Sequence, residues 1–503
     1  MMISYSTLIL KHLGINSYKE PIIYMRSDCY ICKSEGFEAQ TRVCVTLNKH
    51  SIIATVNMIE SDLLHHNQAS LSEYAWEMLH AKEGDSISIT HPPPLESLNY
   101  IRSKIFGHTL HKEEMQQIIS DIISGRLSDI HIAMFIAASS RNRLNQQEII
   151  DLTNAMVSTG KQLHWPSELV VDKHCVGGLP GNRTTPIIVA IVAAYGLLIP
   201  KTSSRAITSP AGTADTMEVF TNVNLDITQM RKVVEQENGC LIWGGAVDLS
   251  PADDFLIRIE RTADLDSEEQ MVASILSKKI AAGSTHLVID IPIGKTAKIE
   301  SLIAAELLKK NLNSVANAFN MHTKIIYSDG SQPVGHGIGP ALEASDILAV
   351  LSGDNNAPAD LREHALHLAG YVLEFAPNVP AGQGKAIATT LLDSGQALRK
   401  FEAICKAQGD FRAIEKAPYT HIIESGKSGY ITSIDNRQLA RIAKLAGAPK
   451  SKVAGIELLT SLHNKVEKKQ PLIRIHAQTQ SELNYALSYI QQKHIIFQIE
   501  EQK

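Results

Sequence analysis

A glycine-rich segment near the middle of the chain carries residue types that could hold a phosphate group. It begins at Asp172 and reads DKHCVGGLPGN, between a short apolar run and a longer one. Glycines expose backbone N–H groups and let an anion approach the main chain, and Lys173 supplies a full positive charge. The N-terminus of the helix expected after it adds partial positive charge. The segment indicates a phosphate site; a glycine turn without a ligand is the alternative, and the spacing is not that of a Walker loop.

A second segment gathers hydroxyl side chains around one arginine, Arg205. It runs from Ser203 to Glu218 and reads SSRAITSPAGTADTME. Hydroxyl groups donate hydrogen bonds to phosphate oxygens without adding negative charge. The alternative is a capped turn, because Ser and Thr are common in turns for local reasons.

The N-terminal third is expected to form two domains. Residues 1–92 are β-rich, because 41–48 and 51–56 alternate like strands and a proline triplet then ends the pattern. Residues 95–165 have helical periodicity, and we expect a later helical segment near 253–285 to join them.

The rest of the chain is expected to form an α/β domain and a smaller α+β domain, which makes the fold multidomain. Over residues 166–425 strands alternate with helices, a pattern typical of a mixed, mostly parallel sheet. A strand is expected at 169–171, and a helix at 187–198 with Pro186 in its first position. Residues 426–503 form the C-terminal α+β domain.

The composition is that of a globular protein and argues against several classes. Apolar residues make up 44% of the chain and the net charge is −5, whereas polyanion-binding domains usually carry a basic excess. The longest apolar stretch, 187–200, is shorter than the about 20 residues of a membrane-spanning helix, and the N-terminus does not resemble a signal peptide. We therefore expect a cytoplasmic protein without nucleic-acid or membrane partners.

Six cysteines in 503 residues do not suggest a disulfide framework. Cys29 and Cys32 form one CxxC motif, which can be half of a zinc site or a redox pair. No second CxxC and no nearby pair of histidines completes a tetrahedral site, so ordinary reduced thiols are the favoured interpretation. No cluster of metal ligands is visible elsewhere in the sequence, and no metal or cofactor is expected.

The two central segments together resemble the class II nucleoside phosphorylases, the family of thymidine phosphorylase and AMP phosphorylase. The family pattern is met from Ser203 to Glu218, except that Pro210 replaces Thr or Ala and Met217 fills an aliphatic position. Four further stretches resemble the family, so the resemblance spans roughly residues 95 to 495: 249–253, 273–279, 429–433 and 454–458.

The resemblance implies a role for each matching residue. His174 would contact the pyrimidine carbonyl and Asp266 would match the proton donor of AMP phosphorylases, while Cys175 stands where the family usually has serine. The expected phosphate-binding residues are Lys173, Gly177, Gly178, Thr185, Ser203 and Thr213. The expected substrate-binding residues are Ser204, Arg205, Ala206, Ile207, Thr208, Ser209, Ser274, Lys278 and Lys298, with Arg258 or Arg261 as the base-binding arginine.

The implied reaction is reversible phosphorolysis of thymidine, with inorganic phosphate as co-substrate and a homodimer or larger homo-oligomer as the assembly. AMP phosphorylase is one alternative, because the N-terminal extension and the run 201–209 are similar to it. A phosphoribosyltransferase of the anthranilate type is another; it shares the fold, would need Mg²⁺, and could use the glycine-rich fragment 335–339. A non-catalytic binding protein is disfavoured by the intact set of candidate residues.

Overall fold

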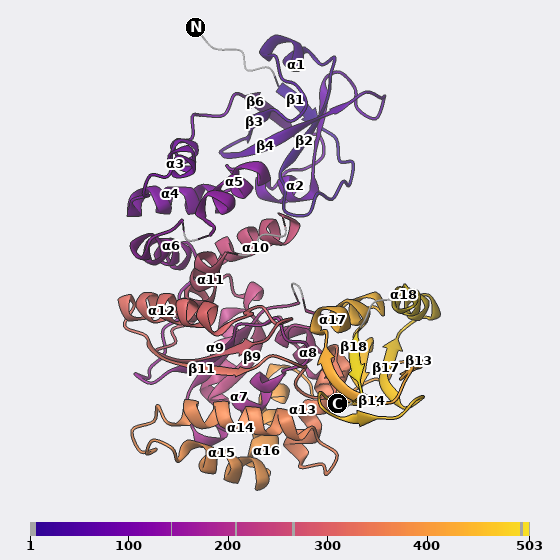
Figure 1. Ribbon diagram of the computed structural model, residues 1–503. Helices are drawn as coiled ribbons and strands as arrows, with labels where there is room; N and C mark the ends of the chain where they lie inside the picture. Colours follow the sequence, from indigo (N-terminus) through magenta and orange to yellow (C-terminus); the bar gives the residue numbers. More distant parts are fainter. Residues whose placement is uncertain (1–6, 142, 207–208, 264–266, 493–495, 502–503) are drawn as a thin grey trace. The chain divides into compact units, whose positions relative to one another are not determined.

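The computed structural model describes residues 7–141, 143–206, 209–263, 267–492 and 496–501 (Figure 1). Contacts divide the chain into two compact units, and each is described by itself. The first comprises Met1–Ala155 and Ala252–Ser267, and the second comprises Met156–Pro251 and Glu268–Lys503. Within the described residues, every helix is too short or too polar to cross a membrane.

The first unit begins with a closed six-stranded barrel. Its strand order is β1-β5-β2-β4-β3-β6, and the side chains of Val43, Val45 and Leu47 alternate into its core. The predicted β-rich region is thus confirmed. Two short helices pack with the barrel. The elements are β1 (Thr7–Leu10), β2 (Ile22–Arg26), α1 (Tyr30–Glu35), β3 (Arg42–Leu47), β4 (His50–Ile59), β5 (Gln68–Leu71), α2 (Glu73–Leu79) and β6 (Ser86–Thr90).

Helices make up the rest of the first unit. The apolar spacing places Met115, Ile118 and Ile122 on the buried face of α4, which confirms the helical periodicity of this region. The segment 252–267, which contains most of α10, belongs to the same compact unit, whereas α11 belongs to the second. The helices are α3 (Glu96–Ile105), α4 (Lys112–Ile123), α5 (Asp129–Ser139), α6 (Gln146–Ser158) and α10 (Pro251–Ala263).

The second unit is built on parallel strands. Strands β7 (Val171–Cys175), β10 (His286–Ile293) and β11 (His322–Asp329) form one sheet in the order β11-β10-β7, and all pairings in it are parallel. Strands β8 (Ile199–Ser203) and β9 (Gly239–Trp243) form a second parallel pair, joined to the first sheet by a bridge between Val170 and Leu198. The α/β fold class is therefore confirmed.

Two boundaries near the glycine-rich segment differ from the prediction. The strand expected at 169–171 is displaced, because β7 runs from Val171 to Cys175 and so contains the polar residues themselves. The following helix, α7 (Thr184–Tyr195), begins before Pro186, which occupies its third position rather than its first. Proline is still tolerated there, because the first-turn N–H groups have no partner within the helix.

Helices α8, α13, α14, α15 and α16 of the second unit pack against α7, whose residues from Thr184 to Ala193 are all buried. A helix that is apolar all round has to be covered on every side. The helices are α8 (Thr213–Phe220), α9 (Ile227–Glu237), α11 (Glu268–Ala281), α12 (Leu302–Ala318), α13 (Pro340–Ser352), α14 (Ala359–Leu373), α15 (Gly384–Asp393) and α16 (Gln396–Gln408).

The C-terminal part has the expected α+β character. Its strands form two sheets, in the orders β12-β15-β17-β13 and β16-β14-β18, and two helices pack with them. The elements are β12 (Gly337–Ile338), β13 (Tyr419–Glu424), β14 (Gly429–Ile434), α17 (Asn436–Leu445), β15 (Gly455–Leu458), β16 (Lys465–Val466), β17 (Pro471–Ala477), α18 (Gln480–Gln491) and β18 (Phe497–Glu500).

Candidate active site

Lys173 is a buried cation with a neutral partner. Its side chain is 1% exposed, and its Nζ donates a hydrogen bond to the Thr184 hydroxyl at 2.8 Å. Among the described residues no carboxylate forms an ion pair with it. A buried ammonium group is costly unless an anion or several acceptors compensate it. The geometry therefore leaves this charge suited to an external anion.

Asp172, the residue before Lys173, forms ion pairs with two further lysines. Asp172 is fully buried, with Lys279 Nζ at 2.7 Å and Lys201 Nζ at 3.2 Å from its carboxylate oxygens. Lys201 also donates to the backbone carbonyl of Lys173 at 2.8 Å. Because Asp172, Lys201 and Lys279 come from β7, β8 and α11, the cluster ties together the three elements around the lysine. Sequence reasoning missed these partners, since an isolated lysine in an apolar strand has no periodic signal.

His174 lies next along β7, half-buried in a positively charged environment. Burial, and then the charges of Lys279, Lys201, Lys278 and Lys173, hold its pKa well below the usual 6.5. The imidazole is therefore neutral near pH 7, so it can donate one N–H hydrogen bond to a carbonyl oxygen but is a poor general acid.

Cys175 ends β7 and keeps its thiol proton. Burial and the nearby charge of Asp290 raise its pKa to about 12, and the Asn182 side chain donates to its sulfur at 3.4 Å. Asp290 itself is fully buried on β10, where it accepts hydrogen bonds from Ser328 at 2.6 Å and pairs with His364 at 3.0 Å. Burial opposes its ionisation, but these partners and Lys173 still lower its pKa to about 2.

The glycine pair after β7 needs the left-handed region of backbone space. Gly177 and Gly178 have φ of 91° and 81°. A Cβ on Gly178 would lie 2.5 Å from the backbone nitrogen of Lys298, whereas a Cβ on Gly177 would meet nothing within 4 Å. The loop therefore packs closely on Lys298 on one side and leaves space on the other, as a cradle for a ligand requires.

The N-terminus of α7 has no side-chain cap. Arg183 is its N-cap residue and makes no capping hydrogen bond, so the first N–H groups of α7 keep their partial positive charge. Instead, the Arg183 guanidinium donates to Glu343 at 2.7 Å, to the Thr213 hydroxyl at 3.0 Å and to the Ala211 carbonyl at 2.9 Å. Thr185, the expected phosphate ligand, lies buried in the first turn beside Thr184.

Ser203 is placed at the C-terminal end of β8 with its hydroxyl unused. Its Oγ is buried and has no hydrogen-bond partner among the described residues. A buried polar atom without a partner costs free energy, which a bound acceptor would recover. Of its neighbours in the sequence, Ser204 is exposed and Ser209 donates to the Ala211 carbonyl at 2.8 Å.

The Arg205 side chain makes hydrogen bonds to carboxylates of α8. Its guanidinium donates to Glu218 at 2.8 and 2.9 Å and to Asp215 at 3.2 Å, and lies 5.0 Å from the Trp243 ring centre. The other oxygen of Asp215 accepts the backbone N–H groups of Ala206 and Gly212. These ion pairs join Arg205 to α8, which explains the arginine and acidic positions of the Ser203–Glu218 segment.

Gly212 is fixed by a close backbone approach. A Cβ there would lie 2.5 Å from the Ser204 carbonyl oxygen and 2.5 Å from the carbonyl carbon of Arg205. We expect Gly212→Ala to displace this loop and lower the free energy of unfolding by about 1–3 kcal/mol, as measured by urea denaturation. Gly426→Ala is the control, because a Cβ there meets nothing; equal stability of the two variants would contradict the prediction.

The remaining predicted residues are distributed over both units. Ser274 and Lys278 lie one turn apart on α11, and so on the same face of that helix. Arg258 is in the first unit, where it donates two hydrogen bonds of 2.6 Å to Asp129. Ile207, Thr208 and Asp266 lie outside the described residues, as does the side chain of Arg261.

Comparisons with known proteins agree with this arrangement. Family models match residues 98–160 (glycosyl transferase family, helical bundle domain), 167–398 (glycosyl transferase family, a/b domain) and 430–496 (pyrimidine nucleoside phosphorylase C-terminal domain). A protein of Legionella pneumophila (strain Paris) named "Putative thymidine phosphorylase" is 61% identical over 97% of this chain and 94% of its own length. The chain belongs to the thymidine phosphorylase family.

A second relative and a solved structure are also similar to this chain. "Putative thymidine phosphorylase 2" of Acidovorax sp. (strain JS42) is 54% identical over 97% of this chain and 95% of its own length. Among solved structures, anthranilate phosphoribosyltransferase from Thermus thermophilus is similar with a TM-score of 0.52, at 18% identity over 61% of this chain and 98% of that one. At this identity the similarity concerns the fold alone.

The second glycine-rich fragment, residues 335–339, already uses backbone N–H groups to bind carboxylates of the same chain. The backbone N–H groups of His336 and Gly337 donate to Asp346 at 2.8 and 2.7 Å, and that of Gly335 donates to Asp360 at 3.0 Å. An anion would meet these carboxylates instead of free N–H groups. The fragment thus gives no support to a pyrophosphate site of the phosphoribosyltransferase kind.

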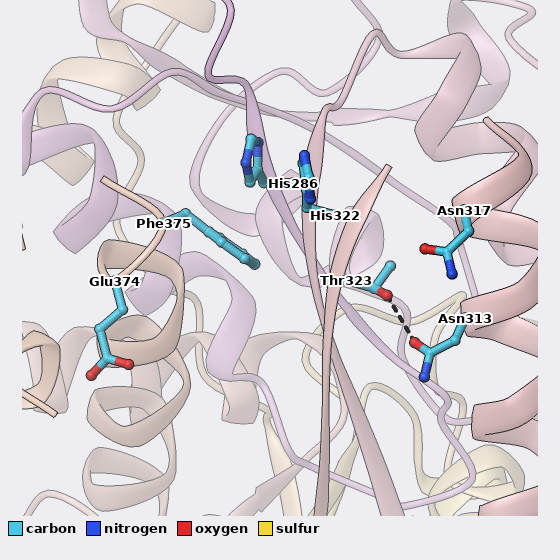
Figure 2. A pocket seen from close by; sticks show the side chains of 7 residues that line it. All are labelled: His286, Asn313, Asn317, His322, Thr323, Glu374 and Phe375. Carbon is cyan, nitrogen blue, oxygen red and sulfur yellow. Dashed lines mark hydrogen bonds between the residues drawn. The ribbon is translucent and has the colours of Figure 1, made fainter. Parts of the chain in front are cut away.

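A surface pocket of about 550 Å³ lies at the amino ends of β10 and β11 (Figure 2). It is lined by His286 and His322, the first residues of β10 and β11, whose rings stack 4.7 Å apart, and by Thr323, which donates to Asn313 at 2.8 Å. The candidate residues of β7 and β8 cluster at the carboxyl ends of their strands, where open α/β sheets bind ligands. This pocket is therefore a different place from the candidate active site.

Proposed function

We propose that the chain catalyses the reversible phosphorolysis of thymidine to thymine and 2-deoxy-α-D-ribose 1-phosphate. The observation that carries the proposal is the buried ammonium group of Lys173, which forms no ion pair with a carboxylate of the described residues and donates to the neutral Thr184 hydroxyl. The uncapped N-terminus of α7 begins at Thr184, the partner of this lysine, and the unused Ser203 hydroxyl lies at the carboxyl end of β8. An oxyanion would supply the charge and the acceptors that these groups lack.

Phosphate is the nucleophile in the proposed step. One of its oxygens forms a bond to C1 of the sugar while the bond from C1 to the base nitrogen breaks, and the bonding electrons leave with the base. Negative charge develops on the carbonyl oxygens of the leaving pyrimidine, where the neutral N–H of His174 and the ammonium group of Lys278 would stabilise it. Asp266 is the proposed source of a proton for the base, as the AMP phosphorylase resemblance implies.

A substrate panel tests the proposal. The purified full chain is incubated with phosphate and with thymidine, uridine, cytidine or AMP, and the released base and sugar phosphate are quantified. We expect turnover of thymidine that EDTA does not reduce. Turnover of AMP alone would replace the proposal by AMP phosphorolysis, and turnover only with a phosphoribosyl pyrophosphate donor and Mg²⁺ would replace it by phosphoribosyl transfer.

The low pKa of His174 leads to a pH prediction. Because its pKa lies well below 6.5 in the folded protein, the imidazole stays neutral from about pH 6 to 8. The ratio of kcat for the unaltered chain to kcat for His174→Gln should therefore be constant across this range, although both profiles change as phosphate titrates. A ratio that changes in either direction as the pH drops through about 6.5 would show that His174 titrates normally.

A further inference from the structure

The CxxC motif of the barrel brings two sulfur atoms together at the start of a short helix. Cys29 is the residue before α1, and its Sγ accepts a hydrogen bond from the Cys32 backbone N–H at 3.3 Å. The two Sγ atoms are 3.0 Å apart and joined by a hydrogen bond. Since a disulfide bond is about 2.05 Å long, the sulfurs need to approach by only about 1 Å to become bonded.

We propose that Cys29 and Cys32 are a redox-active dithiol that small-molecule disulfides oxidise reversibly to an intramolecular disulfide. The geometry rather than the motif carries this inference, because CxxC alone also fits ordinary thiols. Among the described residues, no third His, Cys, Asp or Glu completes a metal site around the pair. A tetrahedral zinc centre needs four ligands, so the pair is left with thiol chemistry.

The surroundings of the two sulfurs distinguish their roles. The hydrogen bond between the two sulfurs is the main factor that lowers the pKa of Cys29 to about 6, and the same interaction raises the pKa of Cys32. The nearby carboxylate of Asp28 slightly opposes ionisation of both. Cys29 is therefore the attacking sulfur and Cys32 the resolving one, the division of labour that reactive CxxC pairs show.

Burial favours the oxidised form once it is made. Cys29 is 0% and Cys32 4% exposed, and both belong to the apolar core of the barrel with Ile31 and Phe37. Burial opposes the charge of a thiolate, although the hydrogen bond with Cys32 outweighs it at Cys29, whereas a disulfide carries neither charge nor an S–H donor. Access requires α1 to open, and this helix has only 6 residues and ends at Gly36. Short surface helices of this kind open locally at low free-energy cost.

The proposed exchange has two balanced steps. The Cys29 thiolate attacks one sulfur of oxidised glutathione, breaks its S–S bond and releases one glutathione thiolate. Cys32 then loses its proton to solvent, and its thiolate attacks the Cys29 sulfur of the mixed disulfide, which releases the second glutathione thiolate. The two protein thiols are oxidised, the glutathione disulfide is reduced, and both glutathione thiolates take up protons from solvent.

The test counts thiols in the full-length protein. The chain is incubated with oxidised glutathione, quenched in acid, denatured and alkylated, and the alkylated cysteines are counted by intact mass. We expect all six cysteines to react before oxidation and two fewer afterwards, with a peptide that links Cys29 to Cys32; dithiothreitol should restore all six. Six alkylated cysteines after oxidation, or a link to another cysteine, would overturn the proposal.

Single variants test the order of the steps. Cys32→Ser should accumulate a glutathione adduct at Cys29, because the resolving thiol is absent, while Cys29→Ser should form at least 10-fold less adduct at Cys32. Cys44→Ser is the matched control, since Cys44 is a half-buried cysteine of the same barrel outside the pair; this variant should still form the link. If either variant fails to fold, the peptide map of the unaltered chain still decides the proposal. None of these readouts depends on phosphorolysis, so they stand apart from the proposed function.

Discussion

Replacing Lys173 with methionine should reduce kcat/KM for phosphorolysis by roughly 10²–10³-fold, the usual effect of removing one main electrostatic contact to a reacting anion. The lysine is buried, its Nζ donates to a neutral hydroxyl at 2.8 Å and no carboxylate of the described residues forms an ion pair with it, so its charge is available to phosphate. Methionine keeps most of the side-chain volume, which limits the cavity left behind. The measurement is steady-state turnover with phosphate as the varied substrate.

The control for this variant is a buried lysine that already has a carboxylate. Lys104 is 4% exposed and lies 2.6 Å from Glu148 in the first unit. Lys104→Met leaves Glu148 buried without its cation, so it should lower stability by about 3–5 kcal/mol while KM for phosphate in the folded fraction stays unchanged. If Lys173→Met bound and turned over phosphate like the unaltered chain, the lysine would have no part in the reaction.

The sequence predicted most of the frame around the site, because its signals are local. Alternation within segments marked β3 and β4 of the barrel, and the succession of strand and helix patterns marked the α/β character of the second unit. The glycine pair and Lys173 stood out because glycine and lysine are unusual between two apolar elements. The start of α7 was wrong by three residues, because Pro186 is compatible with any position in the first turn.

What the sequence could not predict were contacts between distant segments. Arg205 matched a family position, but its carboxylate partners become evident only when α8 folds back beside the loop. The pairing of Asp172 with Lys201 and Lys279 joins residues 29 and 107 positions apart in the chain, which no periodicity records. The polar residues of β7 looked like a loop, because strands with several buried charges are rare.

A large stability effect is also expected at Asp172. Asp172→Asn keeps the shape of the side chain but leaves two buried ammonium groups, Lys201 and Lys279, without their carboxylate. Breaking a buried ion pair by removing one partner costs about 3–5 kcal/mol, because the remaining charge is neither hydrated nor compensated. We expect a loss of this size in the free energy of unfolding of the second unit, measured by urea denaturation with tryptophan fluorescence.

A double variant separates charge from packing at this site. If uncompensated charge is the cause, Asp172→Asn combined with Lys279→Met should be more stable than Asp172→Asn alone, because one of the two ammonium groups is gone. Asp393→Asn provides a surface control: its carboxylate pairs with Arg362 at 2.6 Å but is 57% exposed, so its loss should cost less than about 1 kcal/mol. Were Asp172→Asn no more destabilising than this control, the buried cluster could not be what holds β7, β8 and α11 around Lys173.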